Sequence, residues 1–80
     1  MMLRPTPIKV KPENDYSIII EFDSGEKKRF DVKPYIQGSW YGQLNDASYF
    51  NRVTTDGYTV CWPDGQDLCP DELYELSVSV

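Results

Sequence analysis

The alternating pattern of residues 16–22 limits the possible folds more than any other feature of the chain. Every second side chain is apolar and most of the others are polar, the period of a β-strand with one buried face. Ile19 breaks the alternation, which indicates that the second face is partly covered, as in a central strand. Turn residues 23–26 and a further strand-like segment, 27–32, complete a predicted hairpin. The expected buried face consists of Tyr16, Ile18, Ile20 and Phe22.

Two registers are open for this hairpin. A two-residue loop sets Ile20 opposite Arg29, whereas a three-residue loop over residues 24–26 sets Ile20 opposite Phe30. The second register pairs apolar with apolar residues and opposite charges with each other, and each such pair contributes roughly 0.2–1 kcal/mol. It also places Glu26 at the last loop position, where glycine is preferred. We favour the second register because it matches the faces of the two strands.

The remaining segments predict a small α+β domain, a single antiparallel β-meander with a short helix between its two hairpins and a C-terminal helical turn. The chain is expected to begin with a lead-in strand (8–11) and the first hairpin, followed by a helical turn (34–38) and a glycine-bounded aromatic loop (39–44). A helix capped by Asn45 or Asp46 (47–52) comes next. A second hairpin around Asp56-Gly57 (53–62) then leads to a helical turn that Cys69 caps and Pro70 begins. Within the second hairpin, Tyr58, Val60 and Trp62 share a face, and Trp62 is expected in the core. We place a lead-in at residues 1–7, the domain at 8–76 and a tail at 77–80; the segment 75–80 is either a last strand or an extended end.

Charge and size restrict the partners. The formal charge of −5 and the pI near 4.4 argue against nucleic acid and anionic membranes, both of which attract clustered Lys and Arg. The same charge is compatible with a basic protein partner, and a chain of 80 residues leaves homodimerisation open. The first residues lack the apolar run of a signal peptide, and no stretch approaches a membrane span, so we expect a cytoplasmic protein.

The composition also argues against catalysis. The chain has no histidine, which removes the commonest general base and the usual partner of a nucleophilic serine or cysteine. Two cysteines, Cys61 and Cys69, are too few to close a structural zinc site, and we expect them to be reduced. The glycines stand singly in turns and form no phosphate-binding loop. We therefore expect a non-enzyme that holds neither a cofactor nor a metal.

Two groups of residues are candidates for binding. The acidic group surrounds one turn and one helix start, where its carboxylates also have an ordinary role as turn and helix-dipole partners. The aromatic group lies in the glycine-bounded loop, where Trp and Tyr serve as interface anchors or as core residues. The acidic candidates are Asp64, Asp67, Asp71 and Glu72, and the aromatic candidates are Trp40 and Tyr41.

Three motifs resemble a bacterial family. They are Phe30-Asp31-Val32-Lys33-Pro34-Tyr35; Leu44-Asn45-Asp46 with Tyr49-Phe50 and Val53; and Val60-x-Trp62-Pro63-Asp64-Gly65-x-Asp67-Leu68-x-Pro70-Asp71-Glu72-Leu73-Tyr74. With these motifs, residues 8–74 resemble the domain of unknown function numbered 2442. The resemblance implies a small α+β domain without accepted catalytic residues. It departs from the family at Cys69, where Ser or Asp is frequent, and a thiol weakens the helix cap by about 1 kcal/mol.

The same resemblance bears on function. Many members are encoded beside a small protein of another uncharacterised family, an arrangement that resembles toxin–antitoxin pairs. The leading hypothesis is therefore a non-catalytic protein-interaction domain, the acidic antitoxin-like member of a pair whose partner is a small basic protein encoded nearby. The alternative is a small-ligand-binding domain that uses the Trp40–Tyr41 loop. An enzyme acting through the carboxylates of Asp67 and Asp71 is the third and weakest hypothesis.

Overall fold

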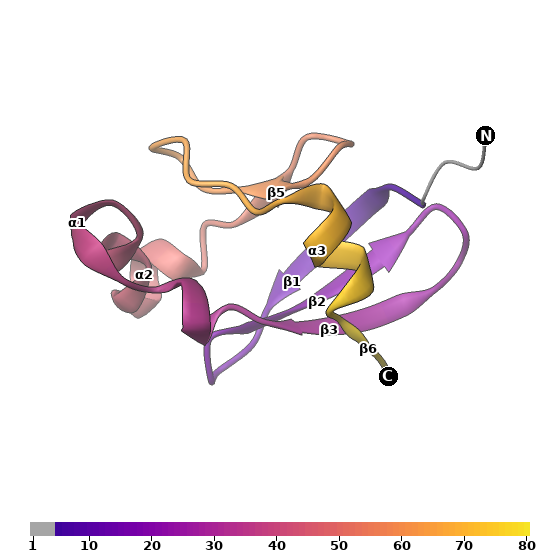
Figure 1. Ribbon diagram of the computed structural model, residues 1–80, viewed down its shortest axis with the longest axis horizontal. Helices are drawn as coiled ribbons and strands as arrows, with labels where there is room; N and C mark the ends of the chain where they lie inside the picture. The colour runs from indigo at the N-terminus through magenta and orange to yellow at the C-terminus, as the bar shows by residue number, and fades with distance from the viewer. Residues whose placement is uncertain (1–4) are drawn as a thin grey trace.

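The computed structural model describes residues 5–80. These residues form one curved antiparallel sheet, and a smaller hairpin and several short helical turns pack on one side of it (Figure 1). The main sheet has the order β1 (Pro7–Pro12), β2 (Ser17–Phe22), β3 (Lys27–Asp31) and β6 (Val78–Ser79), and the smaller one pairs β4 (Thr54–Thr55) with β5 (Val60–Cys61). The helical segments are η1 (Lys33–Tyr35), α1 (Gly38–Tyr41), η2 (Gly42–Asn45), α2 (Ala47–Phe50) and α3 (Pro70–Glu75). The predicted α+β class is confirmed. Of the expected lead-in, residues 1–4 lie outside the described range.

The core lies between the inner face of the main sheet and the segments that cover it. Figure 1 shows α3 crossing this face, with the β4–β5 hairpin beside it. The predicted buried face is confirmed for Ile18, Ile20 and Phe22, which are at most 1 % exposed, whereas Tyr16 precedes β2 and is only partly buried. The rest of the core comes from β3, η2, α2, β5 and α3 and from the segments that connect them: Phe30, Val32, Leu44, Phe50, Val53, Val60, Trp62, Leu68 and Leu73.

Both predicted registers of the first hairpin are wrong, although the faces are right. Ile20 lies opposite Lys28, and Ile18 lies opposite Phe30. The loop spans residues 23–25, and Gly25 occupies its last position with a φ of 92°. A left-handed conformation costs a residue with a Cβ about 1–2 kcal/mol, more than a cross-strand pair contributes. The register therefore moves by two residues relative to the favoured one, which leaves every side chain on its original face.

The segment predicted as an aromatic loop, residues 39–44, is helical instead. Gly38 begins α1 with a φ of 73°, and η2 continues the chain directly to Asn45. The helical turn expected at 34–38 forms earlier, as η1. The capping prediction for α2 is confirmed at Asp46, whose carboxylate accepts a hydrogen bond from the Ser48 backbone N–H at 3.0 Å. The helix itself ends at Phe50, two residues before the expected end.

The second hairpin has a four-residue loop, 56–59, between its paired strands. Tyr58 was expected to share the buried face of this hairpin, and that prediction is wrong: it belongs to the loop and is 61 % exposed. Trp62 is buried as predicted, and its indole N–H donates to the Phe50 carbonyl at 3.0 Å. Cys69 precedes α3 without a side-chain cap, and Pro70 begins the helix. Within residues 5–80, none of the helices has the length and apolar character that crossing a membrane requires.

Candidate interaction face

A tight turn brings one of the aromatic candidates against the acidic segment. The Trp62 backbone N–H donates to the Gln66 carbonyl at 2.8 Å, and the Gly65 N–H donates to the Trp62 carbonyl at 2.9 Å. Gly65 has a φ of 103°, and a Cβ at this position would lie 3.7 Å from Cζ2 of the Trp40 ring. The indole of Trp40 therefore lies over the bare backbone of the turn while remaining 50 % exposed.

A buried glutamine connects α1, η2, α2 and the turn. Gln66 is fully buried. Its Nε2 donates to the Trp40 carbonyl at 3.0 Å and to Oε1 of Gln43 at 2.6 Å. Its Oε1 accepts from the Tyr49 hydroxyl at 2.7 Å, and that hydroxyl accepts from the Asp64 backbone N–H at 2.9 Å. Because each group is satisfied, the network fixes the position of the Trp40 backbone relative to the turn.

The second aromatic candidate is tied to the same turn. The hydroxyl of Tyr41 donates to the Asp67 carbonyl at 2.9 Å, and Asp67 forms an isolated β-bridge with Cys61. Asp64 and Asp67 are both exposed. The structure thus gathers four of the six predicted residues, together with one glycine, into a surface that we name the Trp40 face. It consists of Trp40, Tyr41, Asp64, Gly65 and Asp67.

The two remaining candidates belong to the first turn of α3 and not to this face. Asp71 and Glu72 are exposed there. Glu72 accepts a hydrogen bond from the Tyr35 hydroxyl at 2.8 Å. Burial of the Tyr35 hydroxyl raises its pKa, and the hydrogen bond to the Glu72 carboxylate raises it further. The Glu72 side chain therefore has a structural partner in η1, which agrees with the ordinary role of helix-start carboxylates.

The remaining groups of chemical interest are the potential metal ligands, the two cysteines and a groove on the main sheet. Among residues 5–80, no three side chains of His, Cys, Asp or Glu gather where they could hold a metal ion. Cys61 and Cys69 are both free thiols, and Cys61 Sγ lies 3.8 Å from the Thr54 hydroxyl. An open groove of about 740 Å³ lies on the outer face of the main sheet, and none of the six candidates lines it. Trp40 and Tyr41 lie on α1, outside this groove.

Sequence reasoning missed the residues whose hydrogen bonds hold the Trp40 face in place. Gln66, Gln43 and Tyr49 come from three separate segments, and a glutamine in a turn is ordinarily exposed. The glycine in Trp62-Pro63-Asp64-Gly65 is the one local signal, since it marks a positive φ and the absence of a side chain. That signal indicates close approach by another group, but it does not say which one.

A family match covers nearly the whole chain. Residues 7–79 match the family described as protein of unknown function DUF2442. The chain belongs to the DUF2442 family. The match extends from the first residue of β1 to the last residue of β6, so the DUF2442 region and the folded unit coincide. No curated protein and no solved structure matches the chain significantly.

Proposed function

We propose that this protein is a non-catalytic interaction domain that binds a basic partner protein through the Trp40 face. The observation that carries the proposal is the half-exposed indole of Trp40, held over Gly65 by the buried Gln66 network. An aromatic side chain whose backbone is fixed before binding loses little conformational entropy in a complex. Large aromatic residues of this kind are typical binding hot spots.

The chemistry of the partner follows from the acids beside the indole. Asp64 and Asp67 lie on the turn that Trp40 and Tyr41 contact, and the chain as a whole carries a charge of −5. A Lys or Arg of the partner placed over the indole would gain a cation–π contact of about 0.5–2 kcal/mol and a nearby carboxylate. Asp71 and Glu72 would add long-range attraction that accelerates encounter. This suits the acidic, antitoxin-like member of a two-protein pair whose partner is small, basic and encoded nearby.

The non-catalytic part of the proposal is supported by the composition and by the site. No histidine is present, and the carboxylates of the Trp40 face are exposed and separate from the groove. A small-ligand site at Trp40 and Tyr41 is not put forward, because the concave surface described above belongs to other residues.

Co-purification from a bacterial host that carries the gene, at moderate salt, tests the proposal. We expect the wild-type protein to retain one stoichiometric partner with a basic isoelectric point. Asp64→Lys and Trp40→Ala should each weaken that complex by at least about tenfold. Glu75→Lys is the matched control, because it changes the net charge by the same amount at an exposed position of α3. An acidic partner, no partner, or equal losses in Asp64→Lys and Glu75→Lys would contradict the proposal.

A further inference from the structure

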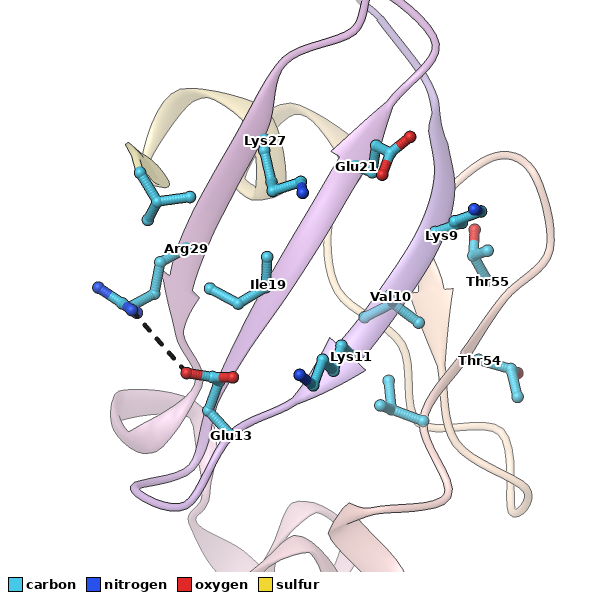
Figure 2. Close-up of a pocket in the computed structure, with 12 residues that line it drawn as sticks. Lys9, Val10, Lys11, Glu13, Ile19, Glu21, Lys27, Arg29, Thr54 and Thr55 are labelled. Atoms are coloured by element: carbon cyan, nitrogen blue, oxygen red, sulfur yellow. Dashed lines mark ion pairs between the residues drawn. The ribbon is translucent and has the colours of Figure 1, made fainter.

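The outer face of the main sheet carries positive charge on an otherwise acidic protein. The observed register aligns Lys9 with Glu21 and Lys27 in one row across the strands. The neighbouring row aligns Lys11 with Ile19 and Arg29. Figure 2 shows these side chains on the side of the sheet away from α3, with Lys residues on β1, Glu21 and Ile19 on β2, and Lys27 and Arg29 on β3.

We name this surface the basic sheet face; it consists of Lys9, Lys11, Ile19, Glu21, Lys27 and Arg29. Four of the chain's eight Lys and Arg residues line the groove on this face, against two carboxylates, those of Glu13 and Glu21. Glu13 is already engaged, since its Oε1 lies 3.8 Å from a guanidinium nitrogen of Arg29. The cations therefore outnumber the acids locally, although the whole chain carries a charge of −5.

The cations of this face lie on both sides of an apolar residue. The cations form two columns, on β1 and β3, which flank the central strand and lie about 10 Å apart, twice the spacing of neighbouring strands. Ile19 provides a partly exposed apolar surface between the columns. At the edge of the groove, Val80 is 58 % exposed and continues the apolar surface beside Lys27.

We propose that the basic sheet face is a second interaction surface, which binds an acidic segment of a partner protein. Carboxylates on the two sides of such a segment would meet the two columns of cations, and an apolar side chain between them would cover Ile19. The two surfaces would be complementary in charge, because a positive patch on a negative protein favours partners whose own negative charge is locally concentrated. Lys9, Lys11 and Lys27 make no ion pair with another described residue, so their ammonium groups are available for this contact.

A protein segment fits this face better than a phosphate polymer does. Glu21 lies in the middle of the row formed with Lys9 and Lys27. A continuous phosphate backbone or an anionic bilayer would bring negative charge against that carboxylate and against a chain of net charge −5. A peptide carries discrete carboxylates and can place a neutral side chain next to Glu21. The proposal is independent of the Trp40 face, because the two surfaces share no residue.

Fluorescence anisotropy with defined probes tests the proposal on the full chain. The probes are a labelled peptide of Glu-Ala-Leu-Glu repeats, the same peptide with Gln in place of Glu, and a labelled single-stranded oligonucleotide. We expect the Glu peptide to bind, the Gln peptide to bind at least about tenfold more weakly, and salt to weaken the first interaction. Lys9→Glu with Lys11→Glu should weaken binding of the Glu peptide by at least about tenfold.

The control is Lys33→Glu with Arg52→Glu, which changes the formal charge from −5 to −9 as the first pair does, since each substitution contributes −2. Both control residues are exposed and lie outside the groove. We expect the control pair to retain binding within about threefold.

Lys9→Gln with Lys11→Gln provides a milder variant should the Glu pair unfold. Trp40→Ala should leave peptide binding unchanged. Equal losses in the two charge pairs, equal binding of the two peptides, tighter binding of the oligonucleotide, or loss of the peptide in Trp40→Ala would overturn the proposal.

Discussion

Replacing Gln66 with Ala should destabilise the protein strongly, although the residue lies in a surface turn. The fully buried side chain makes three hydrogen bonds, to the Trp40 carbonyl, to Gln43 and to the Tyr49 hydroxyl. Gln43 is exposed, so water can replace its lost partner. The carbonyl of Trp40 and the hydroxyl of Tyr49 lose partners in a less accessible place, at about 1–1.5 kcal/mol each. The expected loss in the free energy of unfolding is therefore about 2–3 kcal/mol.

Urea denaturation followed by tryptophan fluorescence measures this loss directly. For a domain of this size, such a change lowers the melting temperature by about 10–20 °C. Gln43→Ala is the matched control, because it removes one bond of the same network at an exposed position and should cost less than about 1 kcal/mol. Combining Gln66→Ala with Tyr49→Phe should give a coupling energy of at least about 0.5 kcal/mol. A loss below about 0.5 kcal/mol in Gln66→Ala, or strictly additive effects, would refute the reasoning.

Two further predictions concern the turns. Gly25→Ala should cost about 1–2 kcal/mol in the free energy of unfolding, because the position has a φ of 92° and no neighbouring atom would contact the new Cβ. Gly42→Ala, whose φ of −60° suits any residue, should be neutral or slightly stabilising, and equal effects in the two variants would contradict the explanation of the register. The backbone N–H groups of Thr59 and Tyr58 lower the pKa of the Asp56 carboxyl. The ionised carboxylate therefore stabilises the fold above its unfolded pKa of about 3.9. This contribution is lost as the pH falls through the lower pKa of the folded state. The stability difference between wild type and Asp56→Asn should therefore decline on acidification below about pH 4 in urea titrations; a difference independent of pH would show that the charge is unimportant.

Local patterns were sufficient to predict the buried faces of β2 and β3 and the starts of two helices. Alternation over residues 16–22 placed Ile18, Ile20 and Phe22 in the core, since successive side chains of a strand point to opposite faces. Asp46 and Pro70 marked the starts of α2 and α3 for equally local reasons, a carboxylate that accepts a backbone N–H and a fixed φ. These signals operate within a few residues of the chain and do not depend on what packs against them.

The register of the first hairpin depends on its loop more than on cross-strand pairing. Pairing of like side chains favours Ile20 opposite Phe30, whereas the last loop position favours glycine. In the structure, Gly25 takes that position and Lys28 faces Ile20. Lys28 is accommodated on the inner side because its ammonium lies 3.9 Å from the Tyr74 ring centroid and donates to the Tyr74 carbonyl. That stabilising partner is 46 residues away in the sequence.

The sequence by itself thus determined the α+β class, the acidic balance, the buried side of β2 and β3 and the burial of Trp62. Only the tertiary structure decided that Gln66 is buried, that Trp40 lies over Gly65, and that the cations of β1 and β3 align across the outer face. The physical reason is the range of the interactions. Periodicity and capping depend on neighbours along the chain, whereas both proposed binding surfaces arise from contacts between segments that only folding brings together.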